Sequence, residues 1–497
     1  MKQLTGLDAT FLYMETPTQF GHVSGLSIFR RPDDPDYDPL AAWCAEIARR
    51  MHRLEPLRRR VRDVPFRLDH PYWEDDPDFD LEYHVRHTAV APPGTDHQLG
   101  ELVARIIGRP LDRRRPLWES YVIEGLPDDR FGILTKIHHA TVDGASGAEL
   151  LTMMLDDSPD ADHAADDAAE PWTPSPPATD AGVLARATLG LARKPARALV
   201  LGARTARDVG RATRNPVLVA AAGQVRSNLR GPVGTVLNLG RDRGTEGRVA
   251  GPLPEAMGPP TPFNATVTAH RRFAFRSTSL SAVKDVKRAM GATVNDVVMA
   301  MCAGGLRRWL ADHDALPDRA LVAMVPISVR TGEEAERWTN RVSALFSALP
   351  TDEDDPLERV RKVNGAMVGA KGLFDAVPAE ELTDFTQFAP PAVFAGAMRT
   401  ALRLTGRLAS PVNLVVSNVP GPRQPLYSAG AELLHYYPVS TIVDGQGLNI
   451  TVQSYRDTLD VGLVACRELV PDLWDMCDHI VEELAVLGEA VGVDVAL

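Results

Sequence analysis

Cysteine, uninterrupted apolar stretches and excess positive charge are all scarce in this chain of 497 residues. Its four cysteines (Cys44, Cys302, Cys466 and Cys477) lack the spacing of metal sites, so we expect a reducing compartment and no disulfide framework. No stretch approaches the ~18 consecutive apolar residues of a membrane span. Residues 1–6 show no signal-peptide pattern. We therefore expect any membrane association to be peripheral.

The net charge of −12 argues against general nucleic-acid binding. With 44% hydrophobic and 24% charged residues, the composition is that of a globular protein. The length suits two domains of about 200 residues each. We predict a first domain over 1–155, a linker and basic helical connection over 156–265, and a second domain over 266–497. Both domains alternate strand-like and helix-like stretches, which predicts an α/β fold.

Short apolar runs predict the strands, and longer amphipathic runs predict the helices. In the first domain the predicted strands are 23–29, 118–124 and 131–138, with helices over 39–54 and 145–154. In the second domain the predicted strands are 270–275, 320–326, 413–416, 448–452 and 459–464. The predicted helices there are 280–290, 294–313 and 473–487.

Two oppositely charged segments lie between the predicted domains. Residues 156–180 hold eight acids, five prolines and no lysine or arginine, which predicts a solvated, disordered linker. Residues 183–230 hold ten basic residues against the single acid Asp208, which predicts basic helices. Two interpretations of the basic segment stay open. It either packs as a solvated face across the two domains, or it faces an anionic membrane or droplet surface or steers an acidic substrate.

The strongest chemical signal is the stretch from Phe131 to Gly144. An apolar run ends in His138 and His139, and Asp143 and Gly144 follow four residues after the second histidine. The run predicts a buried strand, and Asp-Gly predicts a tight turn. His139 then lies where a strand gives way to a loop, and imidazole accepts a proton near neutral pH. A structural hydrogen-bonding role is the alternative. A shared metal is disfavoured because adjacent strand residues point to opposite faces.

The motif His-His-x-x-x-Asp-Gly resembles the signature of the CoA-dependent acyltransferases that include chloramphenicol acetyltransferase and peptide-synthetase condensation domains. Across nearly its whole length the chain resembles one branch, the bacterial wax ester synthase/diacylglycerol acyltransferase family. The blocks that carry the resemblance are LTGLDATFLYMETP at 4–17, RPLWE at 115–119, NDVVMA at 295–300, VPISVR at 325–330 and SNVPGP at 417–422. One departure is Thr339 before Asn340, where the family often has glycine, and we interpret it as a local loop change.

The resemblance implies two chloramphenicol-acetyltransferase-like α/β domains with a tunnel between them. It implies acyl transfer from acyl-CoA to diacylglycerol, and also to long-chain alcohols to make wax esters. It further implies a cytoplasmic protein at the membrane or lipid-droplet surface, with acyl-CoA as substrate and no metal or other cofactor. Two alternatives remain: a related acyltransferase using a polyketide alcohol or a carrier-bound donor, and a non-catalytic lipid-binding protein.

By the same resemblance His139 is the general base, and the alcohol attacks the thioester without an acyl-enzyme intermediate. We interpret His138 as a structural neighbour on the other face of the strand. Asp143 is expected to pair with an arginine that fixes the loop, and Gly144 to permit the turn. We do not expect a serine-protease-style relay between His139 and Asp143.

Neutral donors are needed for the negative charge that develops on the thioester oxygen. Asn295 is one candidate, because the capping-box spacing of Thr293 and Asp296 places it at a helix start. Capping by itself explains Asp296 but does not explain Asn295. Asn418, with Ser417 beside it, is the second candidate, since the pair ends an apolar run and could line the tunnel or merely make a turn.

Trp118 begins a predicted strand, and core packing is its expected role. Shaping the acyl pocket is the alternative for this side chain.

Overall fold

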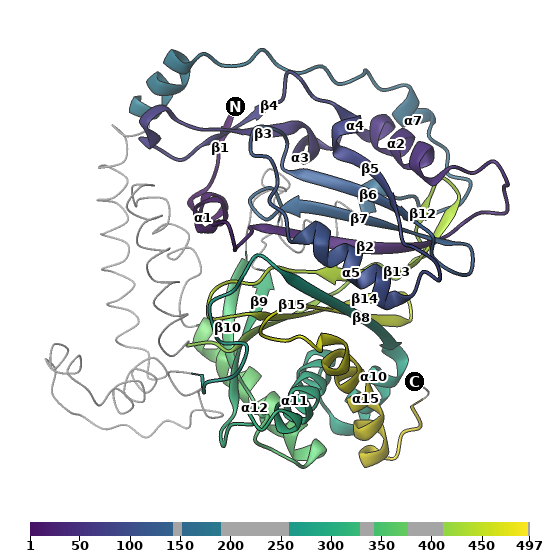
Figure 1. Cartoon of the computed structure of the whole chain (residues 1–497), viewed down its shortest axis with the longest axis vertical. Helices are drawn as coiled ribbons and strands as arrows, with labels where there is room; N and C mark the ends of the chain where they lie inside the picture. The colour runs from purple at the N-terminus through teal and green to yellow at the C-terminus, as the bar shows by residue number, and fades with distance from the viewer. Residues whose placement is uncertain (143–151, 190–257, 329–341, 376–410, 496–497) are drawn as a thin grey trace, which may run out of the picture.

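The computed structural model describes residues 1–142, 152–189, 258–328, 342–375 and 411–495. In this part of the chain two six-stranded sheets, each with helices packed against it, form the two halves of the molecule (Figure 1). The first sheet has the order β12-β13-β2-β7-β6-β5, and the second has the order β10-β9-β11-β14-β15-β8. The mixed α/β class predicted from the sequence is confirmed.

The first sheet carries the histidine motif. Its strands are β2 (His22–Arg30), β5 (Val85–Ala89), β6 (Trp118–Glu124), β7 (Arg130–His138), β12 (Tyr427–Ser428) and β13 (Ala431–Val439). β7 runs antiparallel between β2 and β6, so both of its edges are hydrogen-bonded. Helix α2 (Pro39–Arg50) packs on one face, and α5 (Asp96–Ile107) packs on the other, next to the second sheet. This makes β7 a rigid support.

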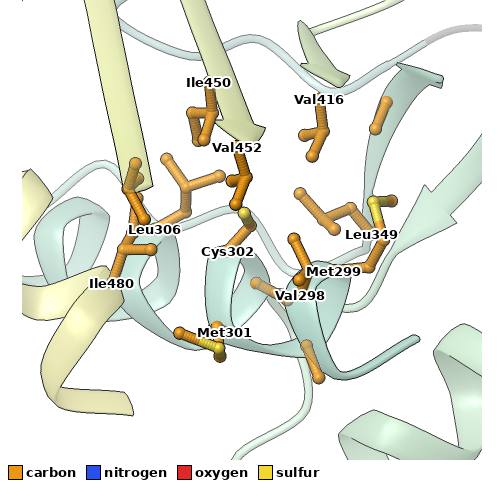
Figure 2. Close-up of a cluster of buried hydrophobic side chains, with 14 of the residues drawn as sticks. Val298, Met299, Met301, Cys302, Leu306, Leu349, Val416, Ile450, Val452 and Ile480 are labelled. Carbon is orange, nitrogen blue, oxygen red and sulfur yellow. The ribbon is translucent and has the colours of Figure 1, made fainter. Parts of the chain in front are cut away.

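The second sheet has a core of its own. Its strands are β8 (Arg271–Ser279), β9 (Leu321–Ser328), β10 (Val342–Leu349), β11 (Leu414–Val419), β14 (Leu448–Tyr455) and β15 (Thr458–Cys466). The helices on its outer face are α10 (Leu280–Met290), α11 (Val294–Asp312), α12 (Pro356–Asp375) and α15 (Leu473–Val491). Figure 2 shows α11 residues such as Met299 and Cys302 packed against Val416, Val452 and Ile480. This packing fixes the start of α11 relative to β11.

Smaller elements surround the first sheet. They are β1 (Lys2–Gln3), α1 (Gly6–Met14), α3 (Glu55–Arg58), β3 (Arg59–Arg62), the 3-10 turn at Pro65–Arg67, β4 (Tyr72–Asp75), α4 (Leu81–His84) and α7 (Ala164–Asp167). Thr5 and Asp8 form a complete capping box at the start of α1, which fixes where this helix begins.

Each predicted strand is present, and so is each predicted helix that falls on described residues, but several described elements were not predicted, among them β5, β10, β13, α5 and α12. One helix is shorter than predicted, since the stretch 39–54 is helical only to Arg50. Trp118 is buried in the core, and its Nε1 donates to the Leu57 carbonyl at 2.6 Å, so the packing interpretation is confirmed. Residues 143–151, most of the basic segment and Thr339–Asn340 lie outside the described residues.

The two sheets do not divide cleanly along the sequence. β12 and β13 belong to the first sheet, where β13 pairs along β2, although β11 and β14, which flank them along the chain, belong to the second (Figure 1). Two strands from the C-terminal part therefore complete the sheet that carries the histidine motif. The division at residues 155 and 266 stays a prediction, and this crossing adds a physical tie between the two halves.

The acidic segment contradicts the prediction of disorder. Asp156 exchanges backbone hydrogen bonds with Tyr427 and accepts from Arg50. Asp167 accepts from Arg49 at 3.0 Å, and Ala178 N–H donates to Glu74 at 2.8 Å. The prediction was wrong because it counted charges within the segment alone. The partners of its acids lie elsewhere in the chain.

Among the described helices, none is both long and apolar enough to cross a membrane unaided. α10 and α11 meet those criteria of length and composition only when taken together, and a 101° bend separates them.

Candidate active site

The end of β7 is held by backbone hydrogen bonds on every side. The His138 amide donates to the Leu117 carbonyl at 2.9 Å, and the His139 amide donates to the Gly21 carbonyl at 2.8 Å. The Thr141 amide then turns back to the His138 carbonyl at 2.9 Å. Because paired backbone groups resist displacement, both histidines start from a fixed position.

His138 has the contacts of a structural residue. Its side chain is buried, and Nδ1 accepts the Ala140 amide at 3.0 Å. A neutral imidazole that accepts at Nδ1 carries its proton on Nε2. Here Nε2 lies 3.3 Å from Oε1 of Glu15. These contacts support the interpretation of His138 as a neighbour that shapes the site.

Glu15, at the C-terminal end of α1, joins several parts of the site. Its carboxylate accepts from the Gly21 amide at 2.9 Å and from Nη2 of Arg113 at 2.6 Å. Burial alone would raise the pKa of Glu15, but the hydrogen bond from His138 and the charge of Arg113 lower it to about 2. Glu15 is therefore a carboxylate at neutral pH. It links α1, the 16–21 loop and β7.

Position 21 requires glycine because neighbouring atoms leave no room for a side chain. A Cβ at this position would lie 2.5 Å from Nε2 of His138 and 2.9 Å from the Phe11 carbonyl. Neither neighbour can give way, because one is the buried imidazole and the other is backbone. Any larger residue would displace the loop whose carbonyl receives the His139 amide.

His139 is partly exposed at the end of the strand, and its ring stacks on Phe11 of α1. The ring centroids are 4.0 Å apart, and the planes differ by 9°. Stacking restricts the imidazole plane, while the main chain is held by Gly21. This is the arrangement that a general base needs, since a proton acceptor must be oriented toward its substrate. Asp143 and Gly144 lie outside the described residues, so their roles stay predictions.

The second candidate group lies at the start of α11. Thr293 and Asp296 form the predicted capping box, with the Asp296 amide donating to Thr293 and the Thr293 amide donating to Asp296. Asn364 of α12 also donates to the Asp296 carboxylate, at 2.8 Å. The capping prediction is confirmed. It leaves Asn295 at the first turn with its side chain uninvolved in the cap.

Asn295 and Asn418 are brought together across 123 residues of sequence, with Asn418 Nδ2 lying 3.5 Å from Asn295 Oδ1. At that separation the hydrogen bond is weak. Ser417 precedes Asn418 on β11 and points to the opposite face of the sheet. The amide pair belongs to the second half and the histidines to the first. Cooperation between them would therefore take place across the seam between the halves.

One described group has the composition of a metal site. Ligand atoms of Glu46, Asp156 and His163 lie within 4.8 Å of one another. The Arg50 guanidinium pairs with both carboxylates, so the group is an ion-pair cluster that ties the acidic segment to α2.

Sequence reasoning missed three residues of this site: Glu15, Gly21 and Phe11 as the support of His139. Glu15 and Phe11 stand in the N-terminal block that carries the family resemblance, which was the available signal. Gly21 had none, because a single sequence does not show which side chain approaches a glycine.

The chain is similar to known proteins over nearly its whole length. Residues 4–298 match the model of the wax ester synthase/diacylglycerol acyltransferase catalytic domain, and residues 338–488 match that of the family's C-terminal domain. The chain is 36% identical over 496 residues to a putative diacylglycerol O-acyltransferase of Mycobacterium tuberculosis, covering 98% of this chain and 90% of the relative.

Two solved structures are also similar. One is a wax ester synthase/diacylglycerol acyltransferase from Marinobacter aquaeolei, with a TM-score of 0.68 and 29% identity, covering 99% of this chain and 100% of the other. The other is the first condensation domain of the calcium-dependent antibiotic synthetase, with a TM-score of 0.55 and 17% identity, covering 100% and 98%. The second likeness concerns the fold alone.

Proposed function

We propose, from the premise that this chain belongs to the wax ester synthase/diacylglycerol acyltransferase family, that it transfers an acyl group from acyl-CoA to diacylglycerol. The product is triacylglycerol. Long-chain alcohols are the second acceptor class, because the family and the Marinobacter relative are named for both activities. The observation that carries the proposal is His139, held between Phe11 and the Gly21 carbonyl at the end of a fully paired strand.

In the proposed reaction His139 removes the proton of the acceptor hydroxyl as its oxygen attacks the thioester carbon. The new C–O bond forms and the C–S bond breaks. The proton then passes from the imidazolium to the departing CoA thiolate, so that His139 ends neutral and no acyl-enzyme forms. A positioned general base typically contributes about 10²–10⁴-fold to the rate.

Negative charge collects on the carbonyl oxygen during the attack, and Asn295 and Asn418 are the proposed donors to it. Asn295 accepts through Oδ1, which leaves its amide NH₂ group able to donate. A preorganised neutral donor stabilises such an oxyanion without reorganising at the moment of reaction. Ser417 stays a candidate on the opposite face of β11, the face that does not carry α11.

We also propose that the protein works in the cytoplasm at a membrane or lipid-droplet surface. Both lipid substrate and lipid product partition into such a phase, and the arginine-rich segment 183–230 has the charge to contact anionic lipid. Flotation with vesicles of anionic or zwitterionic phospholipid tests this. Failure of the protein to float with either kind of vesicle would contradict this proposal.

The deciding experiment measures CoA release from palmitoyl-CoA with dioleoylglycerol, hexadecanol or no acceptor. We compare the wild type with His139→Ala and with His87→Ala, a control that removes an exposed imidazole on β5. Release that depends on dioleoylglycerol, collapses in His139→Ala and persists in His87→Ala would support the proposal.

Other outcomes point elsewhere. If the wild type releases no CoA with either acceptor, a carrier-bound donor or a different alcohol becomes the better explanation. Lipid binding unchanged by His139→Ala, without turnover, would indicate a binding protein.

A further inference from the structure

A basic pocket of about 500 Å³ lies at the seam between the two halves. One wall is the C-terminal end of α5 with the residues that follow it, and the other is the start of β8 with the end of β15. The basic lining residues are Arg105, Arg109, His270, Arg271, Arg272 and Arg467. The backbones of the two walls approach closely, since a Cβ on Gly100 would lie 2.7 Å from the Phe273 carbonyl. The pocket is therefore framed by rigid elements.

The positive charge of this pocket is only partly neutralised. Five arginines line it against the single lining acid Glu101, in a chain whose net charge is −12. Glu468, just outside the lining, pairs with His270 at 2.7 Å and with Arg467 at 3.2 Å and neutralises that corner of the pocket. Glu101 lies 3.9 Å from both Arg105 and Arg272, the outer limit of an ion pair. No acid among the described residues lies within ion-pair distance of Arg109. A concave site with such an excess attracts anions.

Arg271 is the buried, hydrogen-bonded side chain of the pocket. It is buried, its Nη2 donates to the Thr18 carbonyl at 2.6 Å, and its guanidinium lies 5.1 Å from the centre of the Phe20 ring. Burial lowers the pKa of Arg271 to about 10, so it remains a cation near neutral pH. It thus places a fixed charge against the 16–21 loop.

Both walls of the pocket lead to the histidine motif. The loop that receives Arg271 continues to Gly21, whose carbonyl accepts the His139 amide. On the other wall, Lys136 of β7 donates to the Arg109 carbonyl at 2.7 Å. Lys136 precedes His139 by three residues, a rise of about 10 Å along a strand. A ligand anchored by phosphates here would reach His139 only through an extended arm.

We propose that this pocket binds the phosphates at the nucleotide end of the acyl donor. CoA carries a diphosphate and a ribose phosphate, and an extended pantetheine arm separates both from the thioester. Guanidinium groups match phosphate oxygens with paired hydrogen bonds, which makes clustered arginines suited to this anion. The inference rests on the proposed function, because it assigns the donor's anionic end to a site beside the proposed base.

The kinetic test uses Arg109→Glu and Arg105→Glu, both at exposed positions, with Arg288→Glu on α10 as the matched control. Each is assayed with palmitoyl-CoA and with palmitoyl-pantetheine, which lacks the nucleotide. We expect KM for palmitoyl-CoA to rise about tenfold for each pocket variant, or ~1.4 kcal/mol, with kcat retained. We expect KM for palmitoyl-pantetheine to stay unchanged, and the control to match the wild type with both donors.

Equal rises with both donors, or no rise with either, would overturn the proposal. Loss of binding to anionic vesicles with unchanged KM for palmitoyl-CoA would also overturn it and assign the pocket to a lipid headgroup.

Calorimetric titration with adenosine 3′,5′-bisphosphate separates this inference from the proposed function, because it needs no turnover. Binding by the wild type that weakens about tenfold in Arg109→Glu and not in Arg288→Glu would support the phosphate site even if diacylglycerol were not acylated. Equal binding by all three proteins would count against the site even if triacylglycerol were made.

Discussion

The histidines at the end of β7 and the amide pair Asn295–Asn418 are positioned by different kinds of interaction. The histidines depend on directional polar contacts that converge on Glu15, Gly21 and a stacked Phe11. The amides depend on a capped helix and on apolar packing between α11 and β11, with only a weak bond between themselves. A polar arrangement fixes orientation but fails when one partner is lost. An apolar one fixes location and tolerates the loss of a single amide.

Removing an amide should therefore affect the reaction and spare the fold. We expect Asn295→Ala to lower kcat by about 10²–10³, the usual cost of one oxyanion donor. The free energy of unfolding should change little, because Thr293 and Asp296 still cap α11. Steady-state kinetics and thermal unfolding check this. Asn364→Ala, which removes a hydrogen bond from α12 to Asp296, is the control. It should lower the free energy of unfolding and leave kcat nearly unchanged.

Removing the charge of Glu15 should affect the fold as well as the reaction. Its pKa of about 2 in the folded protein lies well below the ordinary value of a glutamate, 4.5, which corresponds to about 3 kcal/mol of stability at pH 7. We expect Glu15→Gln to lose roughly that amount and to lower kcat through a displaced His138.

The pH dependence of this loss has a definite sign. The stability that a lowered carboxyl pKa contributes is fully present above about pH 4.5 and is lost as the pH falls toward 2. The difference in unfolding free energy between the wild type and Glu15→Gln should shrink over that window. A difference that stayed constant from pH 7 to pH 3 would contradict the assignment, and Glu358→Gln, an exposed pair on α12, should show little effect throughout.

Crowding the histidine motif should cost somewhat less. Gly21→Ala places a methyl group against His138 and the Phe11 carbonyl, and overpacking of this kind typically costs about 1–3 kcal/mol. We expect lower thermal stability together with lower kcat. Gly365→Ala is the matched control, since a Cβ there meets nothing within 4 Å and alanine favours the helix. Unchanged activity in Gly21→Ala would mean that the loop moves without disturbing His139.

The smallest expected effect comes from removing the N-cap of α11, and it distinguishes capping from catalysis. Thr293→Ala should lower stability by about 1 kcal/mol, the usual value of an N-cap. It should also reduce kcat modestly, because the first turn of α11 orients Asn295. Thr95→Ala removes the equivalent cap of α5 and should lower stability alone. Equal kinetic effects in both variants would argue against a role for Asn295.

Much of the local structure was predictable from the sequence. The strand over 131–138 and the helix over 294–313 follow from hydrophobic periodicity, which depends only on neighbouring residues. The capping box of α11 was predictable for the same reason, because both partners lie within four residues. The order of residues 156–180 was not, since their acids pair with Arg49, Arg50 and other distant arginines.

The sequence by itself determined the motif, the alternation of strands and helices, and the family. Tertiary structure alone decided that β13 completes the first sheet, that Glu15 lies against His138, and that five arginines meet at one seam. The physical reason is the separation in sequence between the interacting residues. Periodicity and capping act within one or two turns of chain, whereas the charges and backbone approaches that position His139 join residues dozens to hundreds of positions apart.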